Sequence, residues 1–280
     1  MRAVGRLQMV RLYVFTGDEL KMEIQWNSVE EIQKKIHSGM IHWLWPVSIL
    51  FSRTILFFVF GFIILLILGF FRINEPLSDV TRWWTYQVIC TNILCFFLLS
   101  WLSSKENMRF LDLIGFDQKS VKKDMLLVLA LLIPSGILGY FGVYLAGVLL
   151  YGDTPPTFMF QSLPIWAAVV SVILFPLTNA LIETTTYFGY SFQRIAVLSR
   201  NKWLAFFIAA SFLALQHIGI PLYLDLKYML WRFVSFLPFA FFAGYIYLKI
   251  RRLFPIVVLH YLADLPLAIV TFVMSINSLR

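Results

Sequence analysis

The sequence contains seven apolar stretches, each long enough for a helix to cross a lipid bilayer. A membrane-spanning helix needs about 20 mostly apolar residues. Inside a bilayer every backbone amide must find a partner within the protein, so such segments form helices. We therefore expect an all-α, polytopic membrane protein with about seven transmembrane helices. The expected spans lie near Leu44–Phe71, Trp83–Leu102, Met125–Tyr151, Leu163–Tyr190, Trp203–Ile220, Met229–Leu248 and Leu253–Ile276.

The composition excludes the other broad classes of protein. Hydrophobic residues make up 60% and charged residues 14% of the chain, against about 45–50% and 25% in soluble domains. A disordered chain would be polar and charge-rich, and a soluble domain could not bury this much apolar surface. The net charge of +8 does not indicate nucleic-acid binding, because the basic residues form short clusters between apolar runs.

The basic clusters predict the orientation in the membrane. Lys and Arg in alternate loops number 17 on one side of the predicted bilayer and 4 on the other. Because cytoplasmic loops are enriched in Lys and Arg, this alternation predicts a multi-pass protein of the cell membrane with its N-terminus in the cytoplasm. Arg194 is counted among the cytoplasmic loop residues.

In the N-terminal segment, residues 1–42, we expect no cleavable signal peptide, because the segment carries charges of both signs and no apolar core of the usual length. Ser28–Glu31 reads as a capping box that opens a short amphipathic helix toward His37, which we expect to lie on the membrane surface. Residues 43–155 are then expected to form the N-terminal transmembrane helices, and residues 156–280 a transmembrane core.

Six ionisable side chains fall inside the predicted spans. A charge at mid-membrane costs at least about 2.5–3.5 kcal/mol, so such residues usually face the protein interior and mark function. We expect the two arginines to reach the membrane surface or to pair with backbone carbonyls. The six are Arg53, Glu183, His217, Arg232, His260 and Asp264.

The spacing of the other four suggests a shared polar site. His260 and Asp264, four residues apart, share one helix face, although Asp264 could instead satisfy a backbone group freed by Pro266. On the fourth span Glu183 begins a polar stripe that continues through Thr186, Tyr187 and Tyr190. We expect both tyrosines to line a substrate pocket.

The chemistry of this set leaves two mechanisms open. A carboxylate beside an imidazole can deprotonate a water, and a second imidazole can stabilise an oxyanion. Two histidines and a carboxylate could instead bind zinc. From the predicted boundaries Glu183 lies roughly 10 Å deep and His217 roughly 20 Å, so a shared site requires the fifth span to tilt or to begin later.

Three motifs resemble those of the CPBP family, the intramembrane endopeptidases related to CAAX prenyl proteases and bacteriocin-processing (Abi) proteins. The family pattern is Glu-Glu-x-x-x-Arg, then Phe-x-x-x-His, then His-x-x-x-Asn/Asp, and the resemblance covers about residues 160–270. The matching segments are Ile182–Tyr190, Ala214–His217 and His260–Asp264.

The resemblance implies a glutamic endopeptidase in which Glu183 and His217 activate a water. It also implies that His260 and Asp264 stabilise the oxyanion, without an obligatory metal. The chain departs from the pattern at Thr184, which replaces the second glutamate, at Phe188, which replaces the arginine, and at Leu213, which replaces the phenylalanine.

The sequence therefore favours an intramembrane endopeptidase that cleaves a membrane-associated peptide or protein, with no cofactor, although zinc remains open. One alternative is a catalytically impaired relative that serves as a membrane scaffold or a bacteriocin-immunity partner. A proton-coupled transporter is another, because intramembrane Glu, His and Asp also form proton relays. The sequence does not identify the substrate or show whether it is prenylated.

Overall fold

The computed structural model describes residues 28–279 apart from 72, 74–75, 153–155 and 158, and every regular element in this part of the chain is helical. The elements are α1 Val29–His37, α2 Leu44–Phe70, α3 Pro76–Arg82, α4 Trp84–Lys105, η3 Phe110–Leu113, α5 Val121–Tyr151, α6 Ile165–Thr184, η4 Thr185–Phe192, α7 Gln193–Ser199, α8 Lys202–Leu215, η5 Gln216–Gly219, α9 Leu226–Ile250 and α10 Phe254–Asn277.

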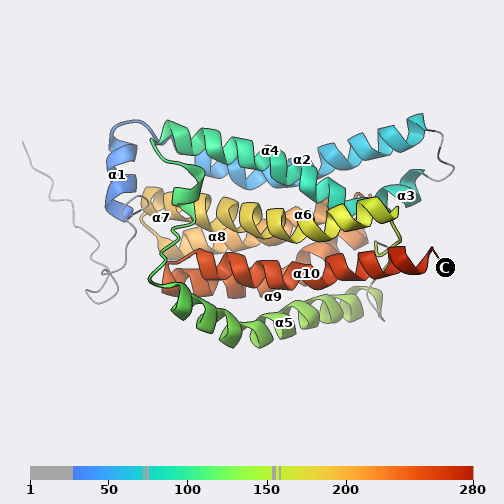
Figure 1. The fold of residues 1–280 in the computed structure, drawn as a ribbon. Helices are drawn as coiled ribbons and strands as arrows, with labels where there is room; N and C mark the ends of the chain where they lie inside the picture. Colours follow the sequence, from blue (N-terminus) through green and yellow to red (C-terminus); the bar gives the residue numbers. More distant parts are fainter. Residues whose placement is uncertain (1–27, 72, 74–75, 153–155, 158, 280) are drawn as a thin grey trace, which may run out of the picture.

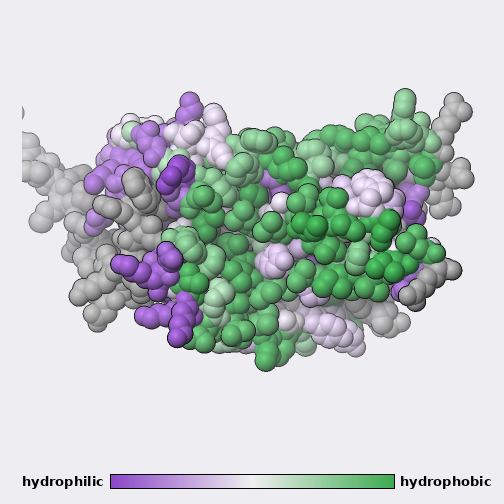
Figure 2. Space-filling view, in the orientation of Figure 1, coloured by the Kyte–Doolittle hydropathy of each residue, from purple (hydrophilic) through white to green (hydrophobic). Residues whose placement is uncertain are grey.

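Within the described part of the chain, seven helices are long and apolar enough to cross a membrane, which confirms the expected polytopic all-α fold. In Figure 1 the long helices run side by side, with α2 and α4 along one edge of the bundle and α5 along the other. Figure 2 shows hydrophobic residues over the length of the bundle and hydrophilic residues gathered at the end that carries α1.

The short helix α1 begins where the capping signal predicts. The Ser28 hydroxyl accepts a hydrogen bond from the Glu31 backbone amide at 3.2 Å, which satisfies a donor that has no partner within the helix. The helix lies across one end of the bundle (Figure 1). It contacts α7 and buries Ile32 and Lys35. Its location at the membrane surface remains a prediction.

The core of the bundle consists of closely packed helix pairs. Helix α6 packs against α10 and α4, and α9 packs against α5 and α8. The α5–α9 pair depends on a glycine, because a Cβ atom at Gly142 would lie 2.4 Å from the backbone oxygen of Ser235. Such close backbone approach through small residues is typical of helix packing in membranes.

The fourth span is longer than the sequence predicted. Instead of ending at Tyr190, the helix continues as the π-helix η4 and then as α7, so that the span reaches Ser199. At about 1.5 Å per residue, Glu183 lies roughly 24 Å from Ser199, and His217 roughly 22 Å from the start of α8 at Lys202. The expected difference in depth between Glu183 and His217 arose because the predicted fourth span ended too early, at Tyr190. With the span extended to Ser199, the two residues lie at similar depths without a tilt of the fifth span.

Candidate functional site

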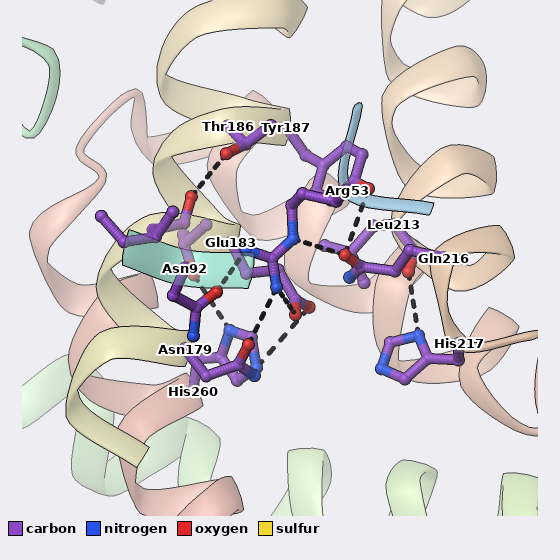
Figure 3. Close-up of polar contacts among 12 residues, drawn as sticks. Arg53, Asn92, Asn179, Glu183, Thr186, Tyr187, Leu213, Gln216, His217 and His260 are labelled. Atoms are coloured by element: carbon purple, nitrogen blue, oxygen red, sulfur yellow. Dashed lines mark hydrogen bonds and ion pairs between the residues drawn. The ribbon is translucent and has the colours of Figure 1, made fainter. Parts of the chain in front are cut away.

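The centre of the site is an ion pair between Glu183 at the end of α6 and Arg53 on α2. The Arg53 Nη2 atom lies 3.2 Å from Glu183 Oε2, and both side chains are almost completely buried. A buried carboxylate requires a partner of opposite charge, because neither ion keeps its hydration shell. Figure 3 shows the guanidinium group inside the cluster, surrounded by polar side chains from other helices.

This arrangement corrects the expectation for Arg53. The side chain neither reaches the membrane surface nor pairs with backbone carbonyls. The sequence showed that an arginine was in the first span but gave no sign of its partner, because Glu183 is 130 positions away. Only the packing of α2 beside η4 and η5 brings the two charges together.

His260 lies on the other side of the Glu183 carboxylate. Its Nε2 atom lies 3.7 Å from Glu183 Oε1 and 3.4 Å from Asp264 Oδ2, which confirms that His260 and Asp264 share one face of α10. The Asp264 carboxylate also accepts a hydrogen bond from Asn179 Nδ2 at 2.9 Å. The fourth and seventh spans therefore bring three ionisable groups together.

Thr184, which stands at the position of the second motif glutamate, contacts the other ring nitrogen of His260. Its hydroxyl lies 3.0 Å from His260 Nδ1. The π-helix η4 begins at the next residue, and all eight of its residues are buried. Such wide turns within helices often occur at functional sites.

His217 lies in the 3₁₀ turn η5 that ends the short fifth span. Its Nδ1 atom lies 3.0 Å from the Leu213 carbonyl oxygen and 3.3 Å from that of Ala214. Because carbonyl oxygens only accept hydrogen bonds, Nδ1 carries the proton and Nε2 presents a lone pair. The ring stacks on Phe236 at 3.5 Å. No ion pair or hydrogen bond joins His217 to Glu183, and Figure 3 shows His217 beside Gln216 rather than at the Arg53 guanidinium.

The two tyrosines expected to line a pocket have different surroundings. The Tyr187 hydroxyl donates to Gln216 Oε1 at 3.2 Å, next to His217. The Tyr190 ring lies 3.9 Å from the Arg194 guanidinium carbon. Thr186 donates to the backbone oxygen of Ile182. The polar stripe on the fourth span therefore divides, and a substrate-binding role for the tyrosines stays a prediction.

The other departures from the motif pattern lie in apolar surroundings. Phe188 is fully buried beside Tyr247 and lies close to Gly244. Arg232 is not part of the motif, and it too departs from the expectation: its side chain is buried over the ring of Phe236 at 4.8 Å, with the Met159 sulfur 3.9 Å from its Nη1 atom, and does not reach the membrane surface. No arginine therefore stands at the motif position in the fourth span.

A second buried ion pair corrects the assignment of Arg194 to a loop. Arg194 is fully buried on α7, where its Nε atom donates to Glu106 Oε1 at 2.8 Å and a second nitrogen contacts Glu106 Oε2. Glu106 caps the C-terminal end of α4. This pair could not be predicted from the sequence, because both residues lie close to the expected ends of spans.

The donors in the cluster do not fit a zinc ion. Within the described part of the chain, no three His, Cys, Asp or Glu side chains are arranged to hold a metal. Glu183 already binds the Arg53 cation, and the Nδ1 atom of His217 is bound to backbone carbonyl oxygens. A dication would also be repelled by the guanidinium at this position.

The family described as Type II CAAX prenyl endopeptidase Rce1-like has a model that matches residues 164–266. This segment contains Glu183, His217, His260 and Asp264, and the match confirms the resemblance seen in the three motifs. It supports a membrane protease function in general and assigns no role to single residues. No curated protein and no solved structure matches the chain.

Proposed function

We propose that this chain, whose residues 164–266 carry an Rce1-like domain, is an intramembrane endopeptidase in which Glu183 and His217 activate a water molecule. The observation that carries the proposal is the clustering of Glu183, His260 and Asp264. It is supported by the contacts of His217 Nδ1 with two backbone carbonyl oxygens, which leave Nε2 as the lone-pair nitrogen of a neutral ring. A protease needs a base for water and a donor for the oxyanion, and this cluster contains candidates for both.

In the proposed reaction, water donates hydrogen bonds to Glu183 Oε1 and to His217 Nε2. Its oxygen attacks the scissile carbonyl carbon, a C–O bond forms, and the released proton passes to Glu183. The C–N bond then breaks, and the leaving nitrogen takes this proton. The two products are a peptide that ends in a carboxylic acid and a peptide that begins with an amine, and no covalent enzyme intermediate forms.

The contact with Thr184 prepares His260 to donate a hydrogen bond to the oxyanion. If the threonine hydroxyl donates to Nδ1, the imidazole proton resides on Nε2. This nitrogen is 3.4 Å or more from both neighbouring carboxylates, longer than a strong hydrogen bond to a charged group. Its N–H is therefore available to a developing oxyanion, and the nearby Asp264 carboxylate favours the tautomer with the proton on this nitrogen.

The substrate in this proposal is a membrane-associated peptide or protein, because the cluster lies roughly 20 Å or more from the α7–α8 end of the bundle. No cofactor takes part. The protein resides in the cell membrane with its N-terminus in the cytoplasm, an orientation supported by the distribution of Lys and Arg, which stays 16 against 4 once Arg194 is removed from the loops.

The orientation can be tested with single cysteines in a variant that lacks Cys90 and Cys95. Lys119→Cys lies in the exposed α4–α5 connection, and Leu224→Cys is exposed before α9 at the opposite end. An impermeant thiol reagent is expected to label position 224 in intact cells and position 119 only in inverted vesicles. The reverse pattern contradicts the orientation.

The second candidate function is a non-catalytic scaffold or immunity partner that keeps the fold and binds a peptide or another membrane protein. Two observations favour it. Arg53 engages the glutamate, and Thr184 and Phe188 replace two motif residues. A scaffold predicts that Glu183→Gln leaves the cellular phenotype of the gene unchanged, whereas an enzyme predicts the phenotype of a deletion.

A cleavage assay tests the proposed function. Wild type and His217→Ala, purified in detergent and shown to be equally folded, are incubated with a quenched-fluorescent peptide library that includes lipidated members. We expect wild type to cleave at least one member, the variant to lose about 100-fold or more of the rate, and a chelator to have no effect. Equal cleavage by both proteins refutes the assigned role of His217, and loss on chelation refutes the metal-independent mechanism.

A further inference from the structure

Arg53 comes from a part of the chain that the family match does not include. It lies on α2, more than a hundred residues before the matched segment 164–266. Its side chain is nevertheless at the centre of the proposed site (Figure 3) and has no exposed surface. The function of this buried arginine has to be found in its contacts.

Every nitrogen of the guanidinium group has a partner, and the partners come from three other helical elements. Nε donates to Gln216 Oε1 at 2.5 Å, Nη1 to Asn92 Oδ1 at 2.5 Å, and Nη2 to Asn179 Oδ1 at 2.9 Å and to Glu183 Oε2 at 3.2 Å. A planar guanidinium with this many fixed acceptors has a single orientation.

Only one of these four partners carries a charge. The three amides direct their carbonyl oxygens at Arg53 and thereby hold it in place, while the Glu183 carboxylate provides the neutralising charge. A buried carboxylate stays ionised only beside a compensating charge, and Arg53 is the cation that the Glu183 carboxylate contacts. Oε2 is bound to Arg53, and Oε1 is left facing His260.

The same arginine also reaches the other half of the proposed water-activating pair. Gln216, which accepts from both Arg53 and Tyr187, directly precedes His217 in η5. Arg53 therefore connects Glu183 on the fourth span to the turn that carries His217 on the fifth. This link can hold the two residues in a fixed relative position.

We propose that Arg53 is the positioning residue of this site, supplying from the first span the cation that is absent from Phe188 in the fourth. It keeps Glu183 ionised and directs Oε1 toward the position of the reacting water. The effect on cleavage rests on the proposed function above, but the effect on the charge of Glu183 does not, and the two can be measured separately.

Infrared spectroscopy of Arg53→Met tests the charge directly. A protonated carboxyl group has a carbonyl band that shifts in D₂O and that an ionised carboxylate lacks. We expect this band to be absent for Glu183 in wild type, to appear in Arg53→Met, and to disappear again in Arg53→Met/Glu183→Gln. Arg232→Met is the matched control, because it removes a buried intramembrane arginine that forms no ion pair with Glu183, and it should not produce the band.

Two further variants keep the proposal testable if Arg53→Met folds poorly. Arg53→Met/Glu183→Gln removes both charges and should melt closer to wild type than the single variant, whereas an arginine needed only for its shape would leave the double variant equally unstable. Arg53→Lys keeps the charge without the planar fork, so we expect an ionised Glu183 but a kcat at least 10-fold lower, with KM changed much less.

The outcomes separate this inference from the proposed function. A Glu183 band in Arg53→Met supports the positioning role even if wild type cleaves no peptide. If wild type cleaves and Glu183→Gln does not, while Arg53→Met shows no band and cleaves at the wild-type rate, the endopeptidase proposal stands and the role of Arg53 is overturned.

Discussion

The buried pair of Arg194 and Glu106 offers a quantitative test of where the fourth span ends. If the span ended at Tyr190, as the sequence alone suggests, Arg194 would lie in a loop and its loss would matter little. In the structure the arginine is fully buried, contacts both carboxylate oxygens of Glu106, and donates to the Tyr190 carbonyl oxygen at 3.1 Å.

The expected cost of Arg194→Met follows from these contacts. Leaving the Glu106 carboxylate buried without a partner costs about 3–5 kcal/mol. The guanidinium also lies 3.9 Å from the Tyr190 ring centroid, and the loss of this contact adds about 1 kcal/mol. The single variant should therefore lose about 4–6 kcal/mol of unfolding free energy. Arg194→Met/Glu106→Gln leaves no orphaned charge and should lose only about 1–2 kcal/mol, a non-additive result.

The assay is denaturant-induced unfolding in mixed micelles, followed by tryptophan fluorescence. Lys123→Met on the exposed surface at the start of α5 is the control, with an expected change within about 0.5 kcal/mol. If Arg194→Met costs no more than this control, or if the double variant loses the sum of the two single losses, the buried pair and the extended fourth span are refuted.

Three further predictions concern packing, the site and helix α1. Gly142→Ala places a Cβ against a backbone oxygen of α9 and should lower the free energy of unfolding by about 1–3 kcal/mol in the same assay. Gly139→Ala on the same helix meets no neighbour and should be neutral or slightly stabilising. Equal effects of the two substitutions contradict the close packing of α5 and α9. Thr184→Val removes the contact with His260 and should lower kcat at least 10-fold in the cleavage assay, while Thr184→Ser keeps the hydroxyl and most of the activity; equal rates for the two exclude the proposed tautomer control. Burial lowers the pKa of Lys35 on α1, against the opposing attraction of Glu106, so the folded state binds this proton less tightly than the unfolded state. The stability of the wild type therefore rises as the pH increases toward the usual lysine pKa. Lys35→Met should be more stable than wild type near pH 7, with a difference that shrinks at higher pH, and a difference in melting temperature that does not change with pH contradicts this.

The spans and the capped helix were predictable because their signals are local. Seven apolar stretches give seven long helices, and Ser28 alone marks the start of α1. The spacing of His260 and Asp264 was sufficient to place them on one face of α10. Each of these predictions needs only the geometry of one helix.

The remaining features depend on contacts between distant segments. The partner of Arg53 could not be read from α2, since Glu183 reaches it only through the packing of the bundle. The predicted end of the fourth span was wrong, because an arginine at this position indicates a loop unless its partner Glu106 is known. The division of the polar stripe results from the π-helix η4, whose wider turn the α-helical spacing did not predict.

The peptide-cleavage rate of Glu183→Gln, measured relative to wild type in the same detergent, tests the central claim most directly. The substitution keeps the shape of the side chain and an oxygen for Arg53 while removing the group that takes the proton from water. We predict a loss of about 100-fold to 10,000-fold in kcat with the protein still folded. Cleavage at the wild-type rate would contradict the account, because the carboxylate at the centre of the cluster would then take no part in the reaction.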